Sequence, residues 1–152
     1  MNIRLFAATS LAAASLGLAG CATLEEAAVE AVSETSRATL TAAQLVGTRG
    51  DPDGSARAEL SVANELDSIC YDLNDVQGLS QITAVTIHRG TVGRTGPVVL
   101  RAQAANEGGW RRCVQRAEWL EAGFERSPGA YYIQVATTEY PNGAIRGQFV
   151  RN

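Results

Sequence analysis

The stretch Tyr131–Val150, YYIQVATTEYPNGAIRGQFV, places two runs of alternating side chains on either side of Pro141-Asn142-Gly143. An Asn-Gly pair between two alternating runs is the strongest short-range signal of a β-hairpin. If Asn142 and Gly143 form a two-residue turn, Glu139 falls directly opposite Arg146. We therefore predict a terminal hairpin with a cross-strand ion pair between Glu139 and Arg146.

Alternation of the same kind continues through most of the chain from residue 37 onward. Runs with a period of two cover residues 37–46, 56–62, 66–76, 82–88 and 98–100, with Gly-rich turns between several of them. Short strands in this pattern are typical of an antiparallel sandwich. The exception is the segment 114–126, where Ala117, Leu120 and Phe124 recur at helical spacing. We therefore predict an all-β sandwich with one short helix near residues 114–126.

The composition excludes several classes of function. All 13 basic residues among the 152 are Arg, against 16 acidic residues and a formal net charge of −3. Without Lys the chain has no Schiff-base lysine, phosphate-loop lysine or lysine general base. The overall negative charge argues against nucleic acid as a partner, because binding it needs a basic stripe. His88 is the single His, so a multi-histidine metal site cannot be built.

Residues 1–20 have the form of a secretory signal peptide, with Arg4 before the apolar run Leu5–Ala19. That run is too short for a transmembrane helix. It closes with Leu18-Ala19-Gly20-Cys21, which resembles the lipobox of bacterial lipoproteins. The resemblance implies a lipoprotein signal peptide removed before Cys21, acylation of the Cys21 thiol and, from Ala22, delivery to the outer membrane of the cell envelope. The alternative is an ordinary secreted protein with a chance cysteine.

Residues 21–36 are interpreted as the lipidated N-terminus and a tether, followed by the folded domain over residues 37–152. The tether has no aromatic residue, Gly or Pro after Cys21, and only one narrow apolar stripe of Leu24, Ala28 and Val32. Such a stripe buries little surface, although a short partner-binding helix is the alternative. The N-terminal lipid makes the membrane an expected partner.

The two cysteines of the domain, Cys70 and Cys113, are predicted to form a disulfide. An even pair in an oxidising envelope is most simply a structural bridge. The alternative is a reactive thiol, but neither cysteine belongs to a C-x-x-C motif or has a His nearby in sequence.

Three segments resemble the CHRD domain, a module named from chordin that also occurs in bacterial proteins. They are Tyr131–Gln148, the run Ile87–Val99 with Gly90, Gly93 and Gly96-Pro97, and the opening strand Leu40–Gln44. The resemblance spans residues 37–150. It implies an immunoglobulin-like, all-β Greek-key sandwich.

The departures from that family bear on chemistry. Members commonly carry His-x-His where this chain has Thr86-Ile87-His88, and a His where this chain has Ala136. Those histidines would share one face of the sheet, and two of the three are absent here. We therefore expect no metal and no cofactor.

The remaining candidates form a possible recognition surface of His88, Arg89, Trp110 and Arg111, because Trp and Arg are frequent interface anchors. The alternative interpretations are structural: a hydrogen-bonding His at the end of a strand, and a Trp packed over the disulfide. The leading hypothesis is a binding or interaction module without catalytic activity, directed at an envelope protein or a glycan. The alternatives are a metal-binding or enzymatic domain centred on His88 and a purely structural lipoprotein.

Overall fold

Strict alternation of buried and exposed residues builds the first two strands of the computed structural model. In β1 (Glu34–Thr41) Ala38 and Leu40 are buried, Arg37 and Thr39 are exposed, and Thr41 is half-buried. β2 (Ser55–Ala63) pairs with β1 in antiparallel register along its length.

The structure describes residues 34–63, 68–105, 109–115 and 118–152. Residues 34–36, which the sequence analysis placed in the tether, are therefore part of the sheet.

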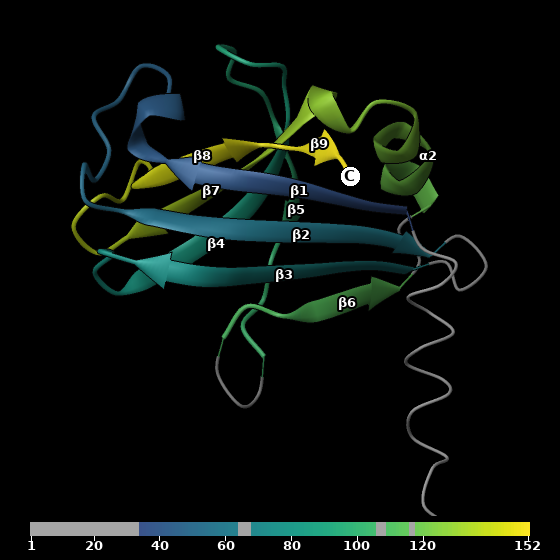
Figure 1. Ribbon diagram of the computed structural model, residues 1–152, viewed down its shortest axis with the longest axis horizontal. Helices are drawn as coiled ribbons and strands as arrows, with labels where there is room; N and C mark the ends of the chain where they lie inside the picture. The colour runs from purple at the N-terminus through teal and green to yellow at the C-terminus, as the bar shows by residue number, and fades with distance from the viewer. Residues whose placement is uncertain (1–33, 64–67, 106–108, 116–117) are drawn as a thin grey trace, which may run out of the picture.

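The other strands extend this pairing into one curled sheet (Figure 1). They are β3 (Ser68–Gln77), β4 (Ile82–Arg89), β5 (Val98–Arg101), β6 (Arg112–Gln115), β7 (Tyr131–Thr137), β8 (Ile145–Gln148) and β9 (Val150–Arg151). The order is β5-β4-β7-β8-β1-β2-β3-β6, β9 pairs with β1, and every pairing is antiparallel. The short helices are η1 (Ala42–Gln44), α2 (Glu118–Arg126) and η3 (Pro128–Ala130). The all-β prediction with one short α-helix is confirmed.

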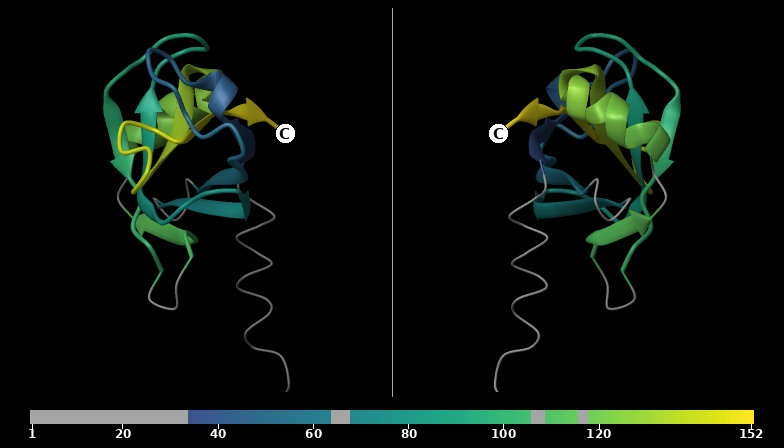
Figure 2. Two further views of the ribbon diagram at one scale, coloured as in Figure 1. Left: turned by 90° about the vertical axis from the view of Figure 1, so that its left-hand side faces the viewer. Right: turned by 90° about the vertical axis from the view of Figure 1, so that its right-hand side faces the viewer.

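The sheet curls over on itself, which gives the molecule a sandwich-like shape (Figure 2). The hydrophobic core lies inside this curl. Ile87 of β4 and Ile69 of β3 belong to one buried cluster, although several strands lie between β4 and β3 in the sheet. α2 covers the end of the sheet where β1 begins (Figure 1) and adds Leu120 and Phe124 to that cluster. Phe124 makes an edge-on contact with Phe149 at 5.2 Å between ring centroids.

The helix is shorter at its start than predicted. Residues 114 and 115, predicted as helical, belong to β6 and pair with β3. The pairing of Cys113 with Cys70 holds this segment in extended form, so sheet pairing overrides the local helical pattern. The predicted end of the helix at Arg126, before η3, is correct.

The terminal hairpin exists, but its predicted turn is wrong. β7 ends at Thr137 and β8 begins at Ile145. The turn is made by Pro141 and Asn142, because the amide of Gly143 donates to the Tyr140 carbonyl at 3.1 Å. Proline favours the second position of such a turn, and glycine favours the fourth.

This register also removes the predicted ion pair. Arg146 lies opposite Gln134, and Glu139 lies exposed in the connection between the strands. The predicted pair of Glu139 with Arg146 is therefore wrong. The longer connection displaces Glu139 beyond the paired part of the hairpin.

Candidate functional site

The outer face of β4, β7 and β8 carries a polar layer on the opposite side from the core. Its members alternate along the strands with core residues, and we call them the outer cluster: Thr86, His88, Tyr132, Gln134, Arg146 and Gln148. The register places them in two rows across the three strands, one through Gln134 and one through Tyr132. The strand periodicity, together with the register of the three strands, therefore brings these side chains together.

The centre of the outer cluster is a three-layer stack around the ring of Tyr132. His88 stacks on the ring with 4.7 Å between centroids and 10° between planes. The Cζ atom of Arg146 lies 3.5 Å from the same ring centroid. Because β7 lies between β4 and β8, His88 and Arg146 approach the ring from different strands. A guanidinium over an aromatic face is a cation–π interaction, which is strongest where both groups are shielded from water.

Both ring nitrogens of His88 have partners. Nδ1 lies 2.9 Å from the Gly96 carbonyl, which can only accept, so Nδ1 carries a proton and donates. Nε2 lies 2.8 Å from the Thr86 hydroxyl. Burial lowers the pKa of His88, and the guanidinium groups of Arg146 and Arg101 lower it further, while the bond to Gly96 opposes them. Nε2 of neutral His88 therefore accepts a hydrogen bond that the Thr86 hydroxyl donates.

Arg146 is a buried cation, only 1% exposed. Its Nη2 donates to the Thr91 carbonyl at 3.2 Å and to Gln148 Oε1 at 3.4 Å. No carboxylate pairs with Arg146 among the residues that the structure describes. Burial lowers the pKa of Arg146, although a guanidinium keeps its proton at physiological pH.

Gln148 joins the outer cluster to the segments around it. Its Nε2 lies 2.8 Å from the carbonyls of both Gly90 and Tyr131. Its backbone amide donates to Gln44 Oε1 at 3.1 Å, which links β8 to η1. The loop that follows β4 is therefore fixed at Gly90 by Gln148, and it is fixed again at Gly96 by His88.

A close backbone approach requires glycine in this loop. A Cβ atom on Gly96 would lie 1.7 Å from the carbonyl oxygen of Arg89. The amide of Gly96 donates to the Tyr132 hydroxyl at 3.2 Å. The loop therefore rests directly on the stack, with no room for a side chain at Gly96.

A groove of ≈ 210 Å³ opens between η1 and this loop. We call it the Arg146 groove. It is lined by Ala43, Gln44, Leu45, Val46, Val92, Gly93, Arg146 and Gln148. Its walls are mainly aliphatic, its charged member is Arg146, and Val92 at its mouth is 77% exposed.

The structure does not gather the four predicted recognition residues into one cluster. His88 is half-buried in the outer cluster, and Arg89 is exposed at the end of β4. Trp110 packs against the core, and its carbonyl accepts a bond from the Leu73 amide at 3.3 Å. Arg111 beside it is exposed. His88 instead meets Arg146, through the ring of Tyr132.

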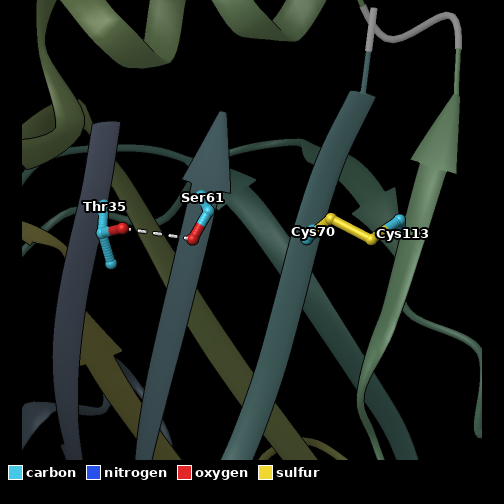
Figure 3. Close-up of a disulfide and its surroundings, with 4 residues drawn as sticks. All are labelled: Thr35, Ser61, Cys70 and Cys113. Atoms are coloured by element: carbon cyan, nitrogen blue, oxygen red, sulfur yellow. Dashed lines mark hydrogen bonds between the residues drawn. A yellow bond between two sulfur atoms is a disulfide. The ribbon is translucent and has the colours of Figure 1, made fainter. Parts of the chain in front are cut away.

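The disulfide between Cys70 and Cys113 is confirmed. It joins β3 to the edge strand β6 and continues an outward-facing row through Thr35 and Ser61 (Figure 3). The hydroxyls of Thr35 and Ser61 lie 3.3 Å apart. The proposed lipid site Cys21, with the signal peptide and residues 21–33 of the tether, lies outside the described residues.

Comparison with known proteins gives one match. Residues 36–149 match the family model described as the CHRD domain. No curated protein and no solved structure matches the chain. Within the described part of the chain, there is no helix long and apolar enough to span a membrane, and no group of three or more His, Cys, Asp or Glu side chains that could hold a metal ion.

Proposed function

Because the chain belongs to the CHRD domain family, we propose that it is a binding module without catalytic activity, anchored by lipid at Cys21 in the outer membrane of a bacterial envelope. The observation that carries the proposal is the Arg146 groove, an aliphatic cleft with a buried cation in its lining. Ligand sites are commonly concave and largely apolar, with a few polar groups that fix orientation.

The outer cluster supports a binding role because it holds the groove in one shape. The loop that carries Val92 is bonded to strand residues on both sides of it, at Gly90 and at Gly96. A site that is already ordered loses less conformational entropy when a ligand binds. Both ring nitrogens of His88 make hydrogen bonds within the protein, to Thr86 and to Gly96. We therefore assign His88 the role of a positioning residue, which holds the loop in place.

The position of the groove relative to the tether also supports the proposal. β1 begins at Glu34, where the chain arrives from the N-terminus, and ends at Thr41, directly before η1 (Figure 1). A strand of this length extends about 23 Å at the rise typical of antiparallel sheets. The Arg146 groove therefore lies at the end of β1 away from Glu34, and in this proposal that is the end of the domain which a partner reaches.

Anchoring is tested by fractionating cells that express the wild-type chain or Cys21→Ser. The wild-type chain is expected in the outer-membrane fraction and the variant in the soluble fraction. Equal membrane recovery of both would contradict the lipid anchor.

Binding is tested by cross-linking the full-length protein in its native envelope and identifying the adducts by mass spectrometry. We expect one reproducible adduct whose cross-linked peptides include the loop after β4 or the segment after η1. Adducts that form equally on all faces, or none, would contradict a binding module and favour a structural lipoprotein.

A further inference from the structure

We propose that the Arg146 groove binds the free C-terminal carboxylate of a partner polypeptide whose last side chain is aliphatic. This inference rests on the proposed function and names the ligand class of the same site. Three features carry it: the charge of Arg146, the unused donors of its guanidinium, and the aliphatic walls around it.

The charge of Arg146 is not matched by an acidic group of the protein. Its recorded partners are the Tyr132 ring, the Thr91 carbonyl and the Gln148 side-chain oxygen, all of which are neutral. Buried charges in proteins are normally paired with an opposite charge or a metal. A ligand carboxylate would supply the missing counter-charge.

The guanidinium of Arg146 also has N–H groups that could donate further hydrogen bonds to a ligand. Both recorded bonds come from Nη2, so Nε and Nη1 of Arg146 have no recorded partner among the described residues. The bond to Gln148 is 3.4 Å long, beyond the usual 2.7–3.2 Å range for N–H···O bonds. Charge-assisted bonds to a carboxylate are shorter and roughly twice as strong as neutral ones. A carboxylate would therefore compete well with the Gln148 oxygen.

The walls of the groove select what is attached to the carboxylate. Leu45, Val46 and Val92 present aliphatic surface beside Arg146. The volume of ≈ 210 Å³ is smaller than the roughly 300–1,000 Å³ of sites that enclose a drug-sized molecule. The groove therefore suits the end of a longer chain, with one side chain inside and the rest of the ligand outside.

A polypeptide terminus fits this chemistry better than a sugar acid or a lipid headgroup. The hydroxyls of a sugar would need several polar partners, whereas the polar lining is limited to Gln44, Arg146 and Gln148. The same argument applies to a lipid headgroup, whose phosphate and further polar groups would also need more polar partners than these three side chains. Capture of a C-terminal carboxylate is a recurring mode of peptide recognition.

The test measures binding of dye-labelled pentapeptides to the full-length lipidated protein in nanodiscs by fluorescence anisotropy. One peptide ends in Leu-Val with a free carboxylate, the second is the same peptide with an amidated end, and the third ends in Leu-Asp with a free carboxylate. We expect saturable binding of the first, with Kd at least tenfold higher for the second and the third. Equal Kd values for the free and amidated peptides, or no saturable binding of the first, would overturn the proposal.

Two variants locate the site. Val92→Glu places a carboxylate at the mouth of the groove, and we expect it to raise Kd at least tenfold because it competes for Arg146. Val150→Glu is the matched control, since Val150 is also exposed (60%) but lies on β9 opposite Arg37. Because both changes are made on the surface, each variant should keep the wild-type circular dichroism spectrum. Equal loss of binding in both, or in neither, would overturn the assignment to the groove.

The peptide-binding and cross-linking experiments together distinguish an error in the proposed ligand class from an error in the proposed function. If the peptides do not bind but the envelope cross-link still maps to the loop and the η1 segment, the ligand class is wrong and the binding module stands. If neither is observed, both are wrong.

Discussion

Removing the disulfide should destabilise the domain by an amount that follows from its place in the chain. The bridge between Cys70 and Cys113 closes a loop of 43 residues. In the chain-entropy model, a cross-link of this span reduces the entropy of the unfolded state enough to stabilise the fold by about 4 kcal/mol at 25 °C. Cys113 is exposed and Cys70 half-buried, so Cys70→Ser combined with Cys113→Ser introduces no deeply buried polar group. We expect nearly the full loss of about 4 kcal/mol in the double variant.

The assay is equilibrium unfolding in urea, followed by far-UV circular dichroism, for the oxidised wild type and the double serine variant. Intact mass with and without reduction confirms that the wild type carries the bridge. Ser61→Ala is the control, because Ser61 lies beside Cys70 in the same row and, among the described residues, its side chain makes a single hydrogen bond, with the Thr35 hydroxyl. It should cost at most about 1 kcal/mol. A double variant as stable as Ser61→Ala, with the wild type fully oxidised, would refute the reasoning.

Three further predictions concern the loop after β4, the half-buried His88 and the core, and all are measured as free energies of unfolding in urea. Gly96→Ala should cost about 1–3 kcal/mol, because its Cβ collides with the Arg89 carbonyl and the loop loses hydrogen bonds to the stack, whereas Gly129→Ala, whose Cβ meets nothing closer than 3.9 Å, should be nearly neutral. His88 has a pKa below its usual 6.5 in the folded state, so the unfolded state binds more protons and stability should fall as pH drops below 6.5. His88→Gln should flatten that fall between pH 7.5 and pH 5, and an unchanged slope would show that His88 is not its source. Phe124→Ala should cost about 3–5 kcal/mol because the Phe124 side chain of α2 is buried in the core, and a loss below 1 kcal/mol would mean that the helix is not packed as described.

Much of the fold could be predicted from periodicity, because one face of the sheet is buried. The alternation over residues 66–76 puts Ile69 and Leu73 on one face and Cys70 on the other, and in β3 the first face is buried in the core while Cys70 faces outward. The limits of the elements were less predictable. β1 ends at Thr41, where the chain turns into η1, although the strand-like run was predicted to extend to residue 46. Where strands end depends on the pairing available, which a single run of sequence does not contain.

The turn of the terminal hairpin shows a second limit. The Asn-Gly pair favours a two-residue turn, but Pro141 immediately before it fixes its own φ near the value required at the second position of a β-turn. The structure follows the proline. Two local signals competed, and the register of Arg146 depended on which one prevailed.

The candidate site was only partly predictable. His88 was singled out by residue type, and Arg146 only as the predicted ion-pair partner of Glu139. Their common partner Tyr132 and the supporting Gln148 were not singled out. Polar residues that alternate with core residues normally face solvent. Here the loop after β4 folds back over them, and only the register of β4, β7 and β8 reveals that they form a buried layer.

Site-specific photo-cross-linking in living cells tests the central claim most directly, namely that the groove end of the domain is the recognition surface. A photoreactive amino acid is placed at position 92, at the mouth of the groove, and in a separate strain at position 150, on β9. The account predicts a discrete adduct from position 92 that disappears when an excess of the Leu-Val peptide with a free carboxylate is supplied to the envelope. No adduct from position 92, or an adduct only from position 150, would contradict it. An adduct from position 92 that the peptide leaves unchanged would overturn the ligand class alone.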